Sequence, residues 1–370
     1  MNDAGDEQAD SPARKLRAYV SEMLTAENLI VMAGLGTSLC VQDAASKQLA
    51  PTMSGLWKEA ESLWDGDIAD LCKRVHYEVP KEKYDFEELM SHCHVALRFN
   101  GDAKIDTFVK ALEKKVVERC RFTPNAADFR VHEDFLRRVA RRTPRRPRMK
   151  LFTTNYDLAF EKASVRPRFV VVDGFSHAMP QDFDGAYFGY DIVRREAVEG
   201  APDYIENVFH LYKLHGSVDW EKKGDRIEKN DKAEKPIIIY PRDTKFAASY
   251  EQPHLEMMSR FQTALRQPKT ALLVIGFGFA DKHLAGPILA ALRSNVGLKM
   301  LIVDTALKTR IEAKHSDAYA EIERFAAAGD PRLGLLNAKF EEFVPHIPDL
   351  MAATEEEHFR ARLAAMPSQP

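Results

Sequence analysis

Cysteine is scarce in this sequence of 370 residues, and its positions exclude two kinds of framework. The four cysteines, Cys40, Cys72, Cys93 and Cys120, lie far apart with no CxxC pair, and none follows position 120. A zinc ribbon and a disulfide framework both need cysteines at short, regular spacings. We therefore predict neither disulfides nor a bound metal.

Long apolar runs are absent as well. The longest, residues 270–279 and 299–303, fall well short of the roughly 20 residues that cross a membrane. The first residues are acidic and polar, and they lack the basic and apolar parts of a secretory signal. A net charge of −3 favours neither a nucleic acid nor a membrane as a partner of the whole molecule. We expect a cytoplasmic protein without membrane contact.

Positive charge is nevertheless concentrated in one segment, Arg137 to Lys150. Eight lysines and arginines lie there, and no acidic residue falls between Asp134 and Asp157. Such a run can bind phosphates or an acidic partner, although it is more typical of a solvated helix end and linker, here punctuated by two prolines. No aromatic residue is interleaved for base stacking, so nucleic-acid contact stays an open alternative.

The second half of the chain alternates strand and helix patterns. Helical patterns fall at residues 254–266, 282–293 and 305–328. Apolar runs of strand length occur at residues 29–33, 150–154, 169–172, 208–214, 236–240, 271–277, 299–304 and 339–344. This alternation predicts an α/β fold with a Rossmann-like, doubly wound parallel sheet.

Between the first and second strands, apolar residues recur at helical spacing, and we predict an inserted helical module over residues 39–148. The sheet domain then comprises residues 29–38 and 149–346. Residues 1–28 form a tail, expected to be disordered over residues 1–10, and a helix capped by Ser11. Residues 347–370 form a C-terminal helix and tail, with a capping box at Thr354.

Glycines or polar residues follow several of the predicted strands. Ligands of open α/β sheets bind outside the carboxyl ends of the strands, so these positions are the first candidates for chemistry. Paired glycines allow backbone amides to approach a diphosphate, and a neutral histidine can take up a proton near pH 7. Taken singly, Asn155 and Asp157 also fit turn and cap positions, His215 fits a core histidine, and Asp281 fits a helix cap.

Four short segments together carry a resemblance. They are GLGTS at residues 34–38, TTNYD at 153–157, KLHGS at 213–217 and GFGFAD at 276–281. In this order and at these separations they resemble the sirtuin superfamily, and most closely its bacterial sirtuin-like branch that acts in phage defence. Two departures are Leu35, where the family has alanine, and the absence of the cysteines that build the zinc ribbon of deacylases.

The resemblance implies that NAD is the substrate and that its bond between nicotinamide and ribose is cleaved. Asn155 would hold the ribose hydroxyls or the attacking water, Asp157 would support the nicotinamide end, and His215 would be the general base. The remaining candidate binding residues are Gly34, Leu35, Gly36, Ser38, Thr154, Gly276, Phe277 and Gly278, which would surround the dinucleotide, with Asp304 on the adenosine ribose.

The favoured function is therefore an NAD glycohydrolase, an effector of abortive antiphage defence that releases nicotinamide and ADP-ribose. The alternatives are an NAD-dependent protein deacylase and a non-catalytic module that senses NAD or ADP-ribose. The resemblance also implies regulation from outside, by homo-oligomerisation or by a separate partner such as a HerA-type ATPase or a short argonaute. The sequence leaves open whether NADP is cleaved.

Overall fold

The computed structural model describes residues 11–78, 86–121, 127–143, 145–195, 203–239, 252–313 and 316–351, and positions 359 and 362. The tail predicted for residues 1–10 and the capping box predicted at Thr354 lie outside these ranges. Within them, no helix is long and apolar enough to cross a membrane.

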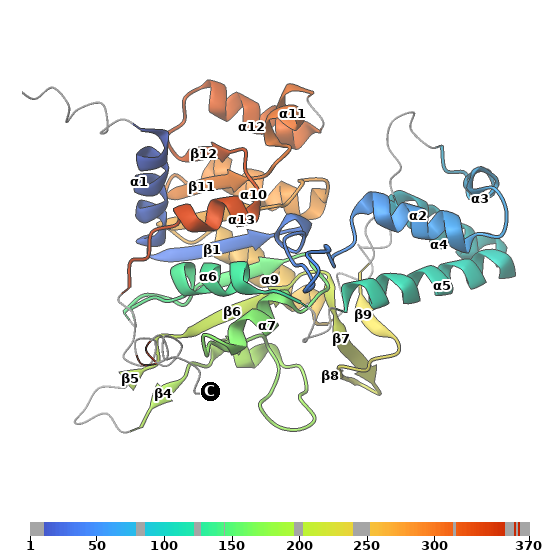
Figure 1. Cartoon of the computed structure of the whole chain (residues 1–370), viewed down its shortest axis with the longest axis horizontal. Helices are drawn as coiled ribbons and strands as arrows, with labels where there is room; N and C mark the ends of the chain where they lie inside the picture. The colour runs from blue at the N-terminus through green and yellow to red at the C-terminus, as the bar shows by residue number, and fades with distance from the viewer. Residues whose placement is uncertain are drawn as a thin grey trace, which may run out of the picture.

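A seven-stranded sheet forms the centre of the molecule (Figure 1), and every pair of neighbouring strands in it is parallel. The prediction of an α/β fold with a parallel sheet is confirmed. In spatial order the strands are β12 (Leu333–Leu336), β11 (Leu298–Val303), β10 (Thr270–Ile275), β1 (Asn28–Ala33), β2 (Lys150–Thr153), β6 (Val208–Lys213) and β3 (Val170–Val172).

Helices cover both faces of this sheet, which explains why its central strands are apolar on both sides. In β1, Val31 faces one apolar cluster and Met32 faces the other. The first cluster includes residues of α1 (Pro12–Leu24), α6 (Arg130–Val139), α7 (Ala159–Val165) and α13 (Phe340–Phe343). The second includes residues of α9 (His254–Leu265), α10 (Lys282–Ser294), α11 (Leu307–Glu312) and α12 (Asp317–Ala327).

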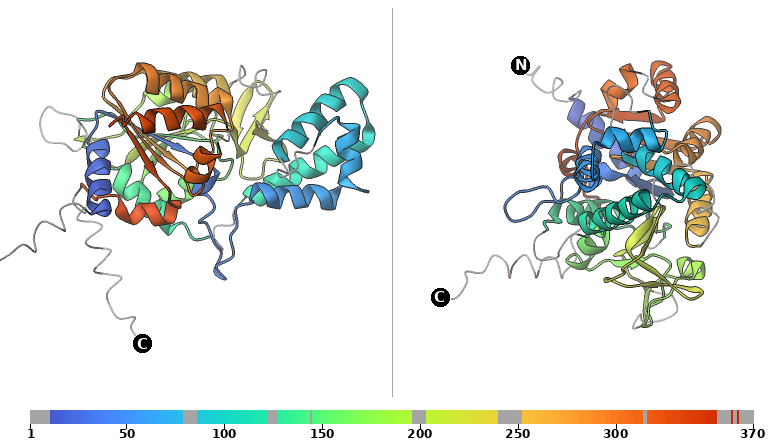
Figure 2. Two further views of the ribbon diagram at one scale, coloured as in Figure 1. Left: turned by 90° about the horizontal axis from the view of Figure 1, so that it is seen from above. Right: turned by 90° about the vertical axis from the view of Figure 1, so that its right-hand side faces the viewer.

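A helical module projects from one end of the sheet (Figures 1 and 2). It comprises α2 (Met53–Leu63), α3 (Ile68–Arg74), α4 (Phe86–Asn100) and α5 (Ala103–Cys120), which share a third apolar cluster. Helix α6 falls within the range predicted for the insertion, but it packs against α7 and the core of the sheet. The exact domain boundaries stay a prediction.

Two small antiparallel sheets complete the described elements. One contains β7 (Gly216–Lys223), β8 (Arg226–Lys229) and β9 (Pro236–Ile238), and it lies between the module and the central sheet (Figure 1). The other pairs β4 (Val193–Arg194) with β5 (Asp203–Tyr204). Short 3-10 turns are η1 (Leu35–Thr37), η2 (Gly185–Gly189) and η3 (Val344–His346).

Three expectations about individual elements need correction. The strand predicted at residues 339–344 is α13 followed by η3, because Phe340, Phe343 and Val344 follow helical spacing and are buried together. The last strand of the sheet, β12, lies before it. The run at residues 236–240 supplies β9 of the small sheet, with position 240 outside the described residues. The helix predicted over residues 305–328 is divided into α11 and α12.

The basic segment is only in part a solvated linker, because Arg145 is exposed whereas three other arginines are buried. Arg141, Arg142 and Arg148 are buried, and Arg148 forms an ion pair with Asp191. Arg142 donates to backbone carbonyls before β1, and burial lowers its pKa to about 10. These contacts tie the chain entering β2 to its neighbours, and they oppose the interpretation of the segment as a free nucleic-acid surface.

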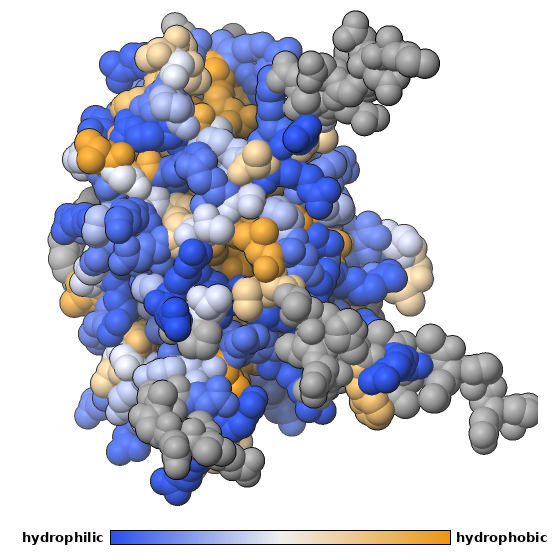
Figure 3. Space-filling model, turned by 90° about the vertical axis from the view of Figure 1, so that its left-hand side faces the viewer, coloured by the Kyte–Doolittle hydropathy of each residue, from blue (hydrophilic) through white to orange (hydrophobic). Residues whose placement is uncertain are grey.

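The face of the molecule that carries α1 is largely hydrophilic, with small scattered apolar patches (Figure 3). Single exposed apolar residues of this kind are normal for a folded protein.

Candidate active site

The order of the strands reverses between β1 and β10. Strands β2, β6 and β3 lie on one side of β1, whereas β10, β11 and β12 lie on the other. Such a reversal opens a crevice at the carboxyl ends of the strands, where α/β proteins bind their ligands. The loops that follow β1 and β10 carry the predicted glycine segments, so both segments border this crevice.

The glycines of these two loops pack directly against each other. Gly36 N donates to Gly276 O at 3.1 Å, and a Cβ atom on Gly36 would lie 2.6 Å from Gly276 Cα. Gly276 itself has a φ of +60°, which favours glycine. A side chain at either position would push the loops apart, so contact between two backbones already accounts for these glycines.

A cavity of about 180 Å³ opens beside this contact, and Gly36, Gly276 and Asp304 all line it. The Asp304 carboxylate is held in place, because Oδ1 accepts from Ala306 N at 2.7 Å and Oδ2 accepts from Arg310 Nη1 at 2.9 Å. Arg310 was not predicted, and its spacing of six residues from Asp304 gives no established signal for such a pair. Three of the predicted cofactor residues thus border one cavity.

A closed hydrogen-bond network surrounds Asn155, which follows β2 and is 8% exposed. Asn155 Nδ2 lies 3.0 Å from Gly34 O, 3.1 Å from Thr37 Oγ1 and 2.8 Å from Ser38 Oγ. All three can accept hydrogen bonds, and Gly34 O can only accept, which fixes the orientation of the amide. The carbonyl oxygen Oδ1 is then the group that can accept a hydrogen bond from a ligand.

Asp157 extends the same network. Its Oδ2 accepts from Ser38 Oγ at 2.7 Å, and its Oδ1 accepts from Ala159 N at 2.9 Å at the start of α7. The carboxylate therefore accepts the amide of the first residue of α7 and also joins the loop after β2 to the loop after β1. Ser38, from the first predicted segment, thus contacts both Asn155 and Asp157, from the second.

A buried lysine that was not predicted binds backbone carbonyls of the loop after β2. Lys213, at the end of β6, is 2% exposed, and its Nζ donates to the backbone carbonyls of Asp157 and Tyr156. Nζ also lies 3.0 Å from Glu161 Oε1. Burial raises the pKa of Glu161, and the positive charge of Lys213 opposes that rise. Its place just before His215 in KLHGS was the signal in the sequence.

His215 lies between β6 and β7 and is 3% exposed. Its Nε2 is 3.4 Å from His283 Nε2 and 3.7 Å from Asp281 Oδ2, and both of these residues follow β10. The next residue, Gly216, has a φ of +86°, and a Cβ atom there would lie 2.0 Å from Ile237 O. Glycine is thus required for the turn that places the histidine.

Asp281 stands at the N-cap position of α10, but its side chain makes no capping hydrogen bond. The expectation that it caps this helix is therefore wrong. Its carboxylate instead lies against the two histidines, with Oδ1 3.8 Å from His283 Nδ1. The donor atoms of these three residues all lie within 4.8 Å of one another, a separation that a metal ion could also bridge.

The two groups of candidate residues lie on neighbouring loops. Leu214 N donates to Thr153 O at 2.8 Å, and Thr154 N donates to Ala33 O at 3.2 Å. The loops after β1, β2 and β6 are thereby held side by side. The structure places the other predicted binding residues, Leu35, Phe277 and Gly278, in the loops after β1 and β10.

Comparison with protein families agrees with this arrangement. Residues 149–321 match the family model of a SIR2-like domain. The match includes the loops after β2, β6 and β10, while the glycine segment after β1 precedes it. SIR2-like proteins use NAD, so the domain implies an NAD-related activity. No curated protein matches the chain.

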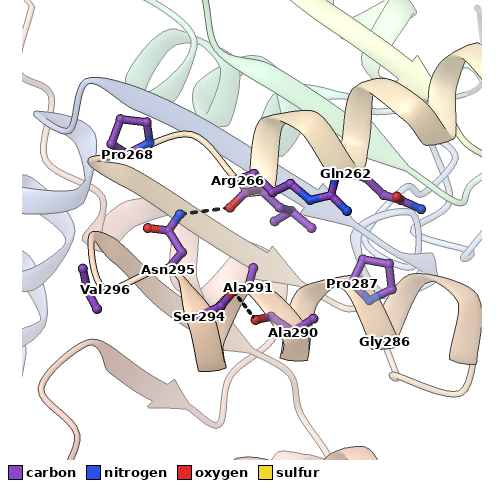
Figure 4. A pocket seen from close by; sticks show the side chains of 11 residues that line it. Gln262, Arg266, Pro268, Gly286, Pro287, Ala290, Ala291, Ser294, Asn295 and Val296 are labelled. Carbon is purple, nitrogen blue, oxygen red and sulfur yellow. Dashed lines mark hydrogen bonds between the residues drawn. The ribbon is translucent and has the colours of Figure 1, made fainter.

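A groove with no predicted site residue lies away from the candidate site. It has a volume of about 500 Å³, and Figure 4 shows it between α9 and α10, bordered by Gln262, Pro287 and Asn295. Pro268 and Val296 line its end, just before β10 and β11 begin. The groove therefore reaches the amino ends of these strands, and none of the predicted site residues lines it.

Proposed function

We propose that this protein hydrolyses NAD to nicotinamide and ADP-ribose. The observation that carries the proposal is the fixed amide of Asn155. Its Nδ2 is used inside the protein, so its Oδ1 can be directed at a ribose hydroxyl or at water. Holding such an acceptor rigidly in advance is how enzymes favour the reactive geometry of a bound substrate.

The proposed reaction breaks the bond between the nicotinamide nitrogen and ribose C1′. Nicotinamide leaves as a neutral molecule, the oxygen of water bonds to C1′, and one proton is released. In this proposal His215 takes that proton, since an imidazole is the usual base near neutral pH. Asp157 supports Asn155 through Ser38 Oγ, which donates to Asp157 and lies 2.8 Å from Asn155 Nδ2.

The other end of the dinucleotide would occupy the cavity beside Asp304. Its glycine-lined wall allows the diphosphate to approach the backbone, and the Asp304 carboxylate can accept hydrogen bonds from a ribose. Arg310 already holds that carboxylate in position. Parallel assays with NAD and NADP would show whether the cavity also accepts a ribose phosphate.

Water is favoured over an acyl-lysine as the acceptor because the chain lacks the cysteines of the zinc ribbon that deacylases carry. No cysteine follows position 120, so the chain cannot build the cysteine-ligated zinc ribbon expected after the HGS segment. The segment there folds as the antiparallel sheet of β7, β8 and β9. A protein deacylase and a module that only senses NAD or ADP-ribose are the competing proposals.

One assay separates the three proposals. Purified protein is incubated with NAD, with and without an acetylated peptide, and free nicotinamide is measured. Hydrolysis predicts release without peptide, deacylation predicts release only with peptide, and a sensor predicts binding of NAD without release in either case.

A pair of variants then tests the role of Asn155. Asn155→Ala should lower the rate of nicotinamide release at least roughly a hundredfold, the magnitude typical of a lost hydrogen-bonding group in an active site. Asn100→Ala is the matched control, because Asn100 is exposed in the helical module. Equal rates for both variants would contradict the proposal.

We further propose that this activity serves phage defence and is restrained from outside, by assembly of copies of the chain or by a separate protein such as a HerA-type ATPase or a short argonaute. The support is the resemblance to the defence branch of the sirtuin superfamily. Co-purification with the products of neighbouring genes, followed by the nicotinamide assay, tests this. Full activity of the isolated chain that no co-purified protein alters would argue against such restraint.

A further inference from the structure

His215 does not stand alone in the candidate site. We propose that Asp281 and His283 are positioning residues for His215, holding its imidazole and passing its proton toward solvent. This inference rests on the proposed hydrolysis of NAD, and it adds two residues to the machinery of that reaction.

The contacts around His215 Nε2 support this arrangement. His283 Nε2 approaches it to 3.4 Å and Asp281 Oδ2 to 3.7 Å. The partners come from the loop after β10 and the first turn of α10, on the other side of β1 from the strand that carries His215. The site therefore joins both halves of the sheet at the crevice. The two histidine rings are 5.5 Å apart and inclined by 30°.

Asp281 is suited to this role because its carboxylate is not used by the helix that it precedes. Aspartate at an N-cap usually accepts a backbone amide of the first turn, but Asp281 makes no such bond. Its two oxygens lie near Nε2 of one histidine and Nδ1 of the other, at 3.7 Å and 3.8 Å. A carboxylate between two imidazoles stabilises the form in which they carry a proton.

The difference in burial between His215 and His283 sets the direction in which the proton would move. The side chain of His215 is 3% exposed, whereas those of Asp281 and His283 are 19% and 23% exposed. Hydrolysis releases one proton in each turnover, and a buried base must give that proton up before it can act again. Two facing imidazole nitrogens can share one proton, so His283 provides a route from the buried His215 toward water.

The other ionisable groups on the surrounding elements have contacts of their own. Lys213, on β6, pairs with Glu161, and Asp157, after β2, accepts from Ser38. Asp219, on β7, accepts from Ser217, and the Tyr156 hydroxyl donates to Ile239 O. Asp281 places its Oδ2 3.7 Å from Nε2 of His215. Because the three groups interact, they should titrate as one unit.

The first test is kinetic and uses three variants of the full chain. Asp281→Asn should lower kcat by roughly ten- to hundredfold, less than the loss of a general base itself, and leave KM within about twofold. The acidic limb of its pH–rate profile should move to lower pH, because removal of a negative charge makes a histidine easier to deprotonate. Lys282→Ala, an exposed change between the two residues, should behave as wild type.

His283→Ala allows a measurement, rescue of kcat by imidazole, that would show no change if His283 had only a structural role. It should lower kcat, and added free imidazole should restore part of the loss by entering the space of the missing ring. The inference is overturned if Asp281→Asn matches wild type in kcat and pH profile, or if the variants change KM alone, which would make these residues substrate contacts.

Metal chemistry is a separate outcome. If a chelator abolishes turnover and zinc alone restores it, the three residues form a metal centre and the proposed proton route is wrong. Turnover that is unchanged after chelation supports the inference.

A second measurement does not depend on turnover, so failure of the proposed function can be told from failure of this inference. Imidazole NMR signals of His215 and His283, assigned by substitution of each, should titrate together and at lower pH in Asp281→Asn. Independent titration that Asp281→Asn leaves unchanged would overturn the inference even in an active enzyme. If the two histidines titrate together as expected but NAD is not turned over, the hydrolase proposal is wrong and the contact between the three residues stands.

Discussion

Around Asn155 the polar contacts measure 2.7 to 3.1 Å and close on one another, whereas around His215 they measure 3.4 to 3.8 Å. The first group joins loops that follow adjacent strands, β1 and β2. The second joins loops on opposite sides of β1. Catalytic contacts are often long before a substrate is bound and tighten in the complex. In terms of the proposed reaction, the chain fixes the group proposed to orient the substrate and leaves room around the group proposed to accept a proton.

The largest expected effect is on stability, and it comes from removing the lysine that binds the loop of Asn155. Lys213→Met removes a buried ammonium group and leaves the partly buried Glu161 without its partner, so we expect a loss of about 3–5 kcal/mol of unfolding free energy. Urea denaturation measures it, with the exposed Lys222→Met as the control. A Lys213→Met/Glu161→Gln double variant should regain part of the loss. If Lys213→Met stays within about 1 kcal/mol of wild type, the ion pair does not carry the loop.

A smaller effect is expected from removing the hydroxyl of Ser38, which contacts both Asn155 and Asp157. Ser38→Ala removes the hydroxyl between Asn155 and Asp157 and should cost about 1–3 kcal/mol of stability. We also expect a fall of about tenfold in nicotinamide release, because the amide loses one of its fixed partners. Ser54→Ala, at an exposed position of α2, is the control. Unchanged turnover in Ser38→Ala would show that Asn155 holds its position without this network.

The smallest effect concerns histidines outside both groups. Burial lowers the pKa of His132 to about 3 and those of His210 and His254 to about 4. The unfolded chain, with histidine pKa values near 6.5, binds these protons first as the pH falls. Their contribution to stability is therefore complete above about pH 6.5 and is lost progressively toward pH 4 and below.

Urea midpoints at pH 7.5 and 5.5 test this dependence. The difference between them should shrink in His132→Leu and stay as in wild type in His346→Asn, whose ring is exposed. If His132→Leu shows the same difference as wild type, the acid sensitivity arises elsewhere, and the His215 group becomes the next place to test.

Local pattern alone predicted much of the fold. The runs at residues 29–33 and 271–277 were assigned as strands because their residues are apolar on both faces, which a covered parallel sheet requires. The same criterion led to a wrong prediction of a strand at residues 339–344. Its short apolar pattern fits a strand or one turn of helix, and only the position of β12 beside β11 decided between them.

Which groups border the crevice could be predicted from the chain, because Asn155, His215 and the paired glycines each follow an apolar strand. The hydrogen-bond partners of those groups became known only from the folded molecule. It set Lys213 beneath the Asn155 loop and brought Asp281 and His283 to His215, although His283 lies 68 residues further along the chain. Spacing along a chain encodes local periodicity, whereas such contacts depend on how strands distant in sequence are ordered in the sheet.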